Sequence, residues 1–301
     1  TNYKKTSIHK TFEEVRRQAR KRGVRVTGSE IVGLVPKEAL IKTGKFYLEK
    51  QGKTTGIPEG EILDLAIQSL GLSDIEIFNI YEKIIEYKIS KNHSSFSNLK
   101  LKEFIDTASM GTPTPGGGTI SALAGSLGMA LTSMVASLSY SKKGLEKHQK
   151  EYIHIGETSQ KYINRMLKLA DLDSMAYDEV IAAHRLPKKT DLDKKNRDNA
   201  IKIAIIKAAD VPMEILELSI KCLKNILKIG KICNKNSITD VGVALFMLYS
   251  AAKGSAINVI VNANELDKKT KSRYLEEINY HINEAEDLFS KINDLVNSIL
   301  K

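Results

Sequence analysis

Residues 111–140 carry no charged side chain, and the run opens with two prolines and three consecutive glycines. The prolines stiffen an extended entry, and Gly116, Gly117 and Gly118 let the backbone approach a partner closely because no side chain stands in the way. A glycine turn that leads into a helix presents unpaired N–H groups and the positive end of the helix dipole. The run therefore predicts either a site for an anion or a polar ring edge, or only a tight turn into a closely packed helix. It is not a P-loop, because Lys-Ser/Thr does not follow the glycines.

The uncharged stretch 120–138 is also long enough to be taken for a membrane span, since about 20 apolar residues cross a bilayer. It is rich in Ser, Thr and Gly, however, and it stands beside strongly amphipathic segments. Small residues of this kind let helices of soluble proteins pack closely. We interpret the stretch as the central helix of a bundle and expect no membrane partner.

From Leu99 onward the hydrophobic pattern is helical and no strand is expected. Pro187 should end the third helix, and Pro212 should break or kink the fourth. Long periodic helices with short connections are typical of an all-α helical bundle. The expected helices cover residues 99–109, 120–140, 145–185, 193–233, 239–264 and 268–301.

Residues 1–90 read instead as a small α/β domain, which fits the two domains expected for a chain of 301 residues. Short strands are expected at 24–26 and 84–89. The serine-rich segment 91–98 is the expected linker between this domain and the bundle at 99–301. Helices are expected at 12–22, 37–51 and 58–70.

The net charge of +10 raises the question of nucleic-acid binding, and Arg16 to Arg22 form a basic run. Lysines are nevertheless spread over the whole chain, aromatic residues make up only 6%, and there is no zinc-finger or stacking motif. We interpret most of these charges as solvated helix faces and expect no nucleic-acid partner. A basic surface would also suit an anionic small ligand.

Only two cysteines are present, Cys222 and Cys233, and this is too few for a disulfide framework. No set of His, Cys and carboxylate residues has the spacing of a zinc site. The sequence therefore predicts a reducing, cytoplasmic setting and neither a metal nor another bound cofactor.

One carboxylate stands out because it interrupts an apolar helical stripe. Asp173 lies on the same helical face as Tyr177, whereas Asp171 and Asp178 point elsewhere and should be solvated. A buried carboxylate needs a partner, and burial raises its pKa. Asp173 is thus either a catalytic acid/base or a carboxylate bonded to a neighbouring helix.

A second helical face carries Asp240, Asn258 and Asn262. Asp240 is favourable in a first helical turn behind Thr239 as N-cap, and the two amides could simply bond neighbouring helices. Together, however, these side chains offer donors and acceptors that could bind the polar edge of a flat ring.

The glycine loop closely resembles the entry to the cyclodeaminase domain of formimidoyltransferase-cyclodeaminase, a folate enzyme of histidine breakdown. Other segments agree in order and spacing, so the resemblance covers nearly the whole chain. Those segments are Leu169–Tyr177, Arg185–Lys188, Ile238–Gly242 and Ile257–Asn262 in the second part, and Val26–Pro36 and Glu82–Tyr87 in the first.

The resemblance implies that residues 1–90 are the C-terminal part of a formimidoyltransferase domain and that 99–301 form an all-α cyclodeaminase domain, which assembles as a homodimer or a higher homo-oligomer. Such a domain closes 5-formimidoyltetrahydrofolate to 5,10-methenyltetrahydrofolate and releases ammonia. The resemblance makes Asp173 the catalytic residue and tetrahydrofolate, possibly polyglutamylated, the ligand. It implies no transferase activity for this chain alone. The expected folate-binding residues are Gly116, Gly117, Gly118, Tyr177, Asp240, Asn258 and Asn262.

Two other functions stay open at this point. A methenyltetrahydrofolate cyclohydrolase shares the cyclodeaminase-type domain, although the transferase-like first part argues against it. The other alternative is not an enzyme: a helical scaffold or an RNA-binding protein that uses the basic run 16–22.

Overall fold

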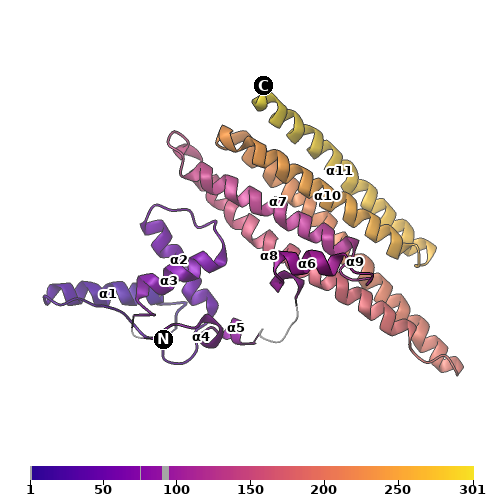
Figure 1. The fold of residues 1–301 in the computed structure, drawn as a ribbon, viewed down its shortest axis with the longest axis horizontal. Helices are drawn as coiled ribbons and strands as arrows, with labels where there is room; N and C mark the ends of the chain where they lie inside the picture. The colour runs from indigo at the N-terminus through magenta and orange to yellow at the C-terminus, as the bar shows by residue number, and fades with distance from the viewer. Residues whose placement is uncertain (1, 75, 90–94) are drawn as a thin grey trace. The chain divides into compact units, whose positions relative to one another are not determined.

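The computed structural model describes residues 2–74, 76–89 and 95–301. The chain divides into two compact units, Thr1–Ser94 and Ser95–Lys301, so the boundary falls inside the expected linker 91–98. Residues 91–94 of that linker lie outside the described residues. Figure 1 shows the helices of both units along the chain.

The first unit is built around two helices, α2 and α3, with a small apolar core between them. Leu40, Leu63 and Leu70 are fully buried in this core, together with Ile84. Helix α3 ends at Gly71, whose left-handed φ of 61° suits glycine. The helices of this unit are α1 (Ile8–Lys21), α2 (Lys37–Lys50), α3 (Glu59–Leu70), α4 (Ile80–Lys83) and α5 (Ile85–Ile89).

The two strands expected in this unit are wrong. Residues 24–26 have no regular structure, and residues 85–89 form helix α5. Among the described residues the one β-type pairing is an isolated parallel bridge between Val35 and Ile84. A strand needs a neighbouring strand to accept its backbone hydrogen bonds, and here Val35 alone pairs with this segment. The first unit is therefore helical rather than α/β.

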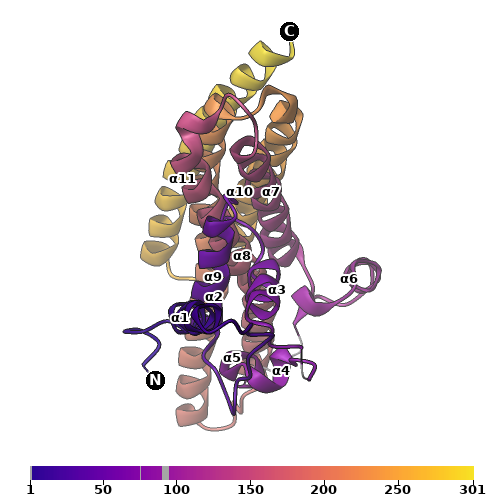
Figure 2. The same ribbon diagram turned by 90° about the vertical axis from the view of Figure 1, so that its left-hand side faces the viewer.

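The second unit is an all-α bundle of long helices, which confirms the expected fold class (Figures 1 and 2). Short connections join the helices, so neighbours in sequence run antiparallel. Figure 2 shows the short helix α6 standing apart from the long ones. The elements are η1 (Phe96–Asn98), α6 (Leu101–Ala108), α7 (Gly117–Tyr140), η2 (Glu146–His148), α8 (Gln149–His184), α9 (Asp191–Ile232), η3 (Lys235–Ser237), α10 (Ile238–Ala263) and α11 (Lys268–Leu300).

Helix α7 packs against α8, α9 and α10 through its small residues. A Cβ atom on Gly125 would lie 2.9 Å from Cε of Met166, and one on Gly128 would lie 2.8 Å from Cγ of Leu248. These glycines bring the helix axes close together. The interpretation as a central helix is only partly right, because one apolar face of α7 is left exposed.

Two stretches of the described residues, Gly117–Tyr140 and Lys235–Ala263, are long and apolar enough to cross a membrane. In the bundle their most apolar windows are 61% and 44% buried, and α7 and α10 pack against each other. Core helices of bundles pass the same length test. The absence of a membrane partner stays a prediction.

Pro212 does not break its helix, so of the two expected outcomes, a break or a kink, the break is wrong. Helix α9 begins at a capping box formed by Thr190 and Asp193 and continues through Pro212 to Ile232. Proline cannot donate the hydrogen bond that the carbonyl of Ala208 would otherwise receive. The side chain of Asn262 on α10 supplies that donor instead, with Nδ2 2.7 Å from the Ala208 oxygen.

Candidate functional site

Most of the side chains expected at the site meet around one cavity in the bundle. The cavity has a volume of about 310 Å³ and lies at the N-terminus of α7, with walls from α8, α9 and α10. The expected residues that line it are Gly116, Gly117, Gly118, Asp173, Tyr177, Asn258 and Asn262.

Asp173 is the carboxylate at the base of this cavity, and α8 presents it to the first turn of α7. Oγ1 of Thr119 donates a hydrogen bond to Oδ2 of Asp173 at 3.0 Å, and the backbone N–H of Thr119 bonds the same carboxylate. Burial raises the pKa of Asp173 above its ordinary value of 3.8, and the two Thr119 hydrogen bonds oppose that rise. The carboxyl group therefore exchanges its proton closer to neutral pH than a surface aspartate does.

Thr119 is itself held in place by the bundle. It is fully buried, and its hydroxyl lies 3.2 Å from Oγ of Ser174 and 3.4 Å from the carbonyl oxygen of Ala170. These contacts fix the hydroxyl beside Asp173. The sequence argument missed Thr119, although its position directly after the glycines, in the first turn of the helix, was the available signal.

The glycines allow other parts of the bundle to pack closely against the entry to α7, and their contact with a ligand stays a prediction. A Cβ atom on Gly117 would lie 3.2 Å from Nδ2 of Asn258. Gly116 is the N-cap of α7 and supplies no side-chain hydrogen bond. Gly117 and Gly118 therefore line the cavity without a bond from the capping residue, at the positive end of the helix dipole, while the Thr119 N–H bonds Asp173.

Asn258 and Asn262 lie one turn apart on α10 and both line the cavity. Nδ2 of Asn258 donates to the carbonyl of Gly254 at 2.8 Å, and Nδ2 of Asn262 donates to that of Ala208. Tyr177 lies on the α8 wall and is 38% exposed. All three can contact a ligand in the cavity.

Asp240 is not brought to this cavity. It lies in the first turn of α10, 18 residues before Asn258 and thus about 27 Å away along the helix axis. The N-cap of α10 is Ser237, not Thr239, which is a helical residue. The expected common face was geometrically correct, but a helix of this length separates its two ends, and we leave Asp240 out of the site.

Asp171 has a structural partner, so the expectation that it is solvated is wrong. Its carboxylate accepts hydrogen bonds from Oγ of Ser95 at 2.5 Å and from the backbone N–H of Phe96 at 2.8 Å. These bonds attach η1 to α8. Asp178, by contrast, is exposed as expected.

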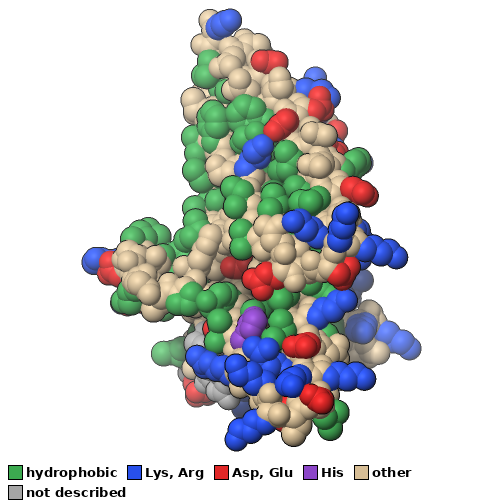
Figure 3. Space-filling model, turned by 90° about the vertical axis from the view of Figure 1, so that its right-hand side faces the viewer, with side chains coloured by type: hydrophobic (Ala, Val, Ile, Leu, Met, Phe, Trp, Pro, Cys, Tyr) green, Lys and Arg blue, Asp and Glu red, His purple; other side chains and the backbone are tan. Residues whose placement is uncertain are grey.

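Basic side chains surround the connection between α8 and α9, beyond the Tyr177 end of the cavity. Arg185, Lys188 and Lys189 are all exposed there. Figure 3 shows Lys and Arg side chains gathered at the lower end of this face of the bundle. Such a group attracts anionic ligands toward the cavity.

The part of the chain that the structure describes holds no group of three or more His, Cys, Asp or Glu residues that could bind a metal ion. The cavity itself offers the carboxylates of Asp173 and Glu265, two side-chain amides, a phenol and backbone N–H groups.

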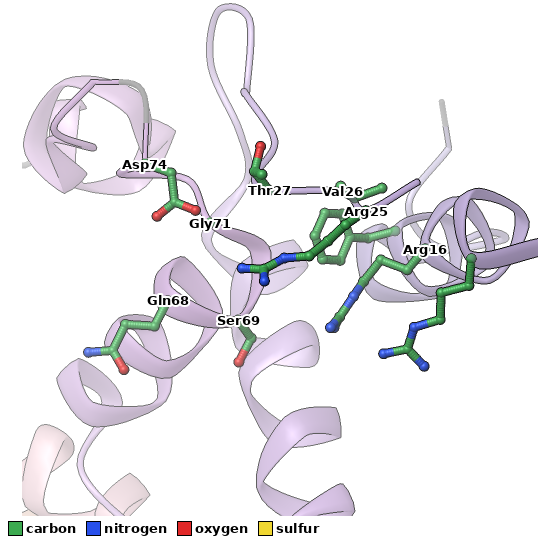
Figure 4. Close-up of a pocket in the computed structure, with 10 residues that line it drawn as sticks. Arg16, Arg25, Val26, Thr27, Gln68, Ser69, Gly71 and Asp74 are labelled. Atoms are coloured by element: carbon green, nitrogen blue, oxygen red, sulfur yellow. The ribbon is translucent and has the colours of Figure 1, made fainter. Parts of the chain in front are cut away.

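A second cavity, of about 490 Å³, lies in the first unit (Figure 4). Arg16 and Arg25 point toward the same space, with Asp74 on its other side. Arg16 and Arg17 each form an ion pair with a glutamate of their own helix, as solvated helix faces do. None of the residues expected at the site lies here.

A sequence model described as formiminotransferase-cyclodeaminase matches residues 100–280, more than half of the chain. The chain belongs to this family. A model of the formiminotransferase domain matches residues 1–90. Both matches confirm the resemblance seen in the motifs.

Individual relatives agree with this assignment. Rat formimidoyltransferase-cyclodeaminase is 28% identical over 285 residues, which are 91% of this chain and 51% of the relative. A methenyltetrahydrofolate cyclohydrolase of Methylorubrum extorquens is 32% identical over 202 residues, 67% of this chain and 97% of the relative. The crystal structure of formiminotetrahydrofolate cyclodeaminase from Thermotoga maritima superposes with a TM-score of 0.62 at 26% identity, covering 68% of this chain and 99% of that one. The chain spans about half the length of the bifunctional relatives.

Proposed function

We propose that this chain is a formimidoyltetrahydrofolate cyclodeaminase, which closes 5-formimidoyltetrahydrofolate to 5,10-methenyltetrahydrofolate and releases ammonia. The observation that carries the proposal is the position of the Asp173 side chain and its environment. A carboxylate of raised pKa stands at the N-terminus of α7, where it accepts from the Thr119 N–H, in a cavity of the domain that matches the family.

The reaction needs one proton to move from one nitrogen to another. N10 attacks the carbon of the protonated formimidoyl group and forms a tetrahedral centre. Asp173 takes the proton from N10 and then delivers it to the amino nitrogen. The C–N bond to that nitrogen breaks, ammonia leaves, and the methenyl cation keeps the single positive charge that the substrate carried. A carboxylate with a raised pKa suits both steps.

The surrounding groups bind and orient the folate. The N–H groups of Gly117 and Gly118 suit a partial negative charge on the ligand, and Tyr177 offers a ring face. Arg185, Lys188 and Lys189 suit the carboxylates of a glutamate tail. In this mechanism neither a metal nor another cofactor takes part.

The test is to follow ammonia and methenyltetrahydrofolate release from 5-formimidoyltetrahydrofolate with the purified chain. Equal amounts of both products are expected. No transferase activity is expected from this chain, because its match to the glutamate formimidoyltransferase of Thermoplasma acidophilum covers only 20% of that relative.

The second candidate is a methenyltetrahydrofolate cyclohydrolase, which the similarity to the Methylorubrum protein favours. That relative matches the bundle, whereas residues 1–90 match the formiminotransferase domain, and this supports the deaminase. Hydrolysis of methenyltetrahydrofolate without ammonia release from the formimidoyl compound would reverse the choice.

The proposal extends to the setting of the protein. The two buried free thiols suit a reducing cytoplasm. The exposed apolar face of α7 suits a homodimer, and the ion-paired arginines of α1 suit solvent rather than RNA.

A further inference from the structure

The two asparagines of the cavity have their amide N–H groups already engaged. Nδ2 of Asn258 bonds the Gly254 carbonyl at 2.8 Å, and Nδ2 of Asn262 bonds the Ala208 carbonyl at 2.7 Å. These bonds decide which way each amide faces. Within the described residues no group donates to Oδ1 of either side chain, so both oxygens are available as acceptors.

The orientation of Asn262 depends on a defect in a neighbouring helix. A carbonyl inside an α-helix normally accepts the N–H of the fourth residue on, which for Ala208 is position 212. That residue is Pro212, which has no N–H, so this bond is missing from α9. The Ala208 carbonyl is thereby left to the Asn262 amide.

The two sides of the cavity therefore differ in polarity. The first turn of α7 offers N–H donors, with Asp173 of α8 beside it, and the α10 side offers two amide oxygens one helical turn apart and, after the helix end, the carboxylate of Glu265. Side chains at this spacing lie on the same helical face. A ligand that satisfies the α10 side must present two N–H donors on one edge.

We propose that Asn258 and Asn262 are an acceptor pair that reads the 2-amino group and the N3–H of the pterin ring, and that Pro212 is the residue that positions Asn262. This inference rests on the proposed function and adds which edge of the ligand is recognised and by which atoms. Discrimination follows because a ligand that lacks a donor leaves a partly buried oxygen unpaired.

The experiment compares the dissociation constants of tetrahydrofolate and of its 2-desamino analogue, which lacks one donor. The wild-type chain should bind tetrahydrofolate about ten-fold more tightly or better. In the leucine variant of the asparagine that accepts from the 2-amino group, Asn262→Leu or Asn258→Leu, the ratio of the two constants should fall toward one, and the other variant should weaken binding of both ligands. Asn264→Leu, an exposed site outside the cavity, should keep the wild-type ratio.

Pro212→Ala tests the positioning role, because an alanine N–H competes for the Ala208 carbonyl. Pro212→Ala should change the two constants in the same way as Asn262→Leu, while Pro187→Ala in the exposed connection after α8 keeps the wild-type constants. A ratio measures discrimination, so a general loss of stability does not by itself change it, and thermal melts confirm folding. Tight binding of both ligands with no preference overturns the acceptor pair, and wild-type constants for both ligands in Pro212→Ala overturn the positioning role. Failure to bind either ligand overturns the proposed function and this inference with it.

Discussion

The α-carbon of Gly118 lies directly against the carboxylate of Asp173. A Cβ atom at position 118 would stand 2.5 Å from Cγ and 2.6 Å from Oδ2 of Asp173, closer than real atoms approach. Glycine at 118 is therefore what allows a carboxylate from α8 to reach the first turn of α7. The glycine loop thus also makes room for the carboxylate that we propose as the acid/base.

Gly118→Ala should displace Asp173 and lower the rate of ammonia release by about 10- to 100-fold, since a misplacement of about 1 Å at a reacting group costs this much. Steady-state kinetics measure the loss. Gly111→Ala is the matched control, because a Cβ atom there meets nothing within 4 Å. Equal rates in the two variants would contradict the seating role.

Asp173→Asn should lower turnover by about 10³-fold or more, because an amide neither takes nor delivers the proton. Tetrahydrofolate binding should remain. Asp178→Asn is the appropriate control; Asp171 is not, because its carboxylate holds Ser95 and Phe96. Near-normal turnover of Asp173→Asn would exclude it as the acid/base.

Thr119→Val should change the pH dependence of the rate. The Thr119 hydroxyl stabilises the ionised form of Asp173, so its removal raises the pKa of that carboxyl group further. The acidic limb of kcat/KM, where Asp173 must lose its proton, should move to higher pH. Ser174→Ala removes a hydroxyl that contacts Thr119 but has no bond to Asp173, and it should leave the limb nearly in place. If the acidic limb of kcat/KM does not move in Thr119→Val, it does not report the ionisation of Asp173.

The same raised pKa predicts how stability depends on pH. The pKa of Asp173 is higher in the folded than in the unfolded chain, so its contribution is fully present below about 3.8 and is lost as the pH rises through the raised value. Asp173→Asn avoids this loss. Urea denaturation should show that the variant gains stability relative to wild type as the pH rises. The free energy of unfolding of the variant minus that of wild type should be larger at about pH 8 than at about pH 4. If this difference does not vary with pH, the pKa of Asp173 is not raised in the folded chain.

The sequence predicted the bundle well because its helices are long and their periodicity is strong. The strand predicted at residues 84–89 was wrong. A short apolar run there fits a strand or a helix equally, and the secondary structure depends on which segments of the same chain pack beside it. Asp173 could be found because it interrupts an apolar stripe. Asp240 was misplaced because a shared helical face says nothing about distance along the axis, and the link from Pro212 to Asn262 joins residues 50 positions apart, which only the fold reveals.

The exposed face of α7 predicts self-association. Ile120, Leu127, Met134 and Leu138 follow each other at steps of seven and four residues, so they form one stripe, and each is between 39% and 51% exposed. Helix α7 contains no charged residue to keep this stripe soluble, and a second copy of the chain would cover it by two-fold pairing.

Light scattering of the full chain should therefore give the mass of a dimer. Leu127→Glu places a charge in the contact and should shift the mass toward the monomer, because an unpaired charge is costly to bury. Ile203→Glu changes another exposed apolar residue, on α9, and should leave the dimer intact. A wild-type chain that stays monomeric at all concentrations, or a Leu127→Glu variant as dimeric as Ile203→Glu, would show that this stripe is not the interface.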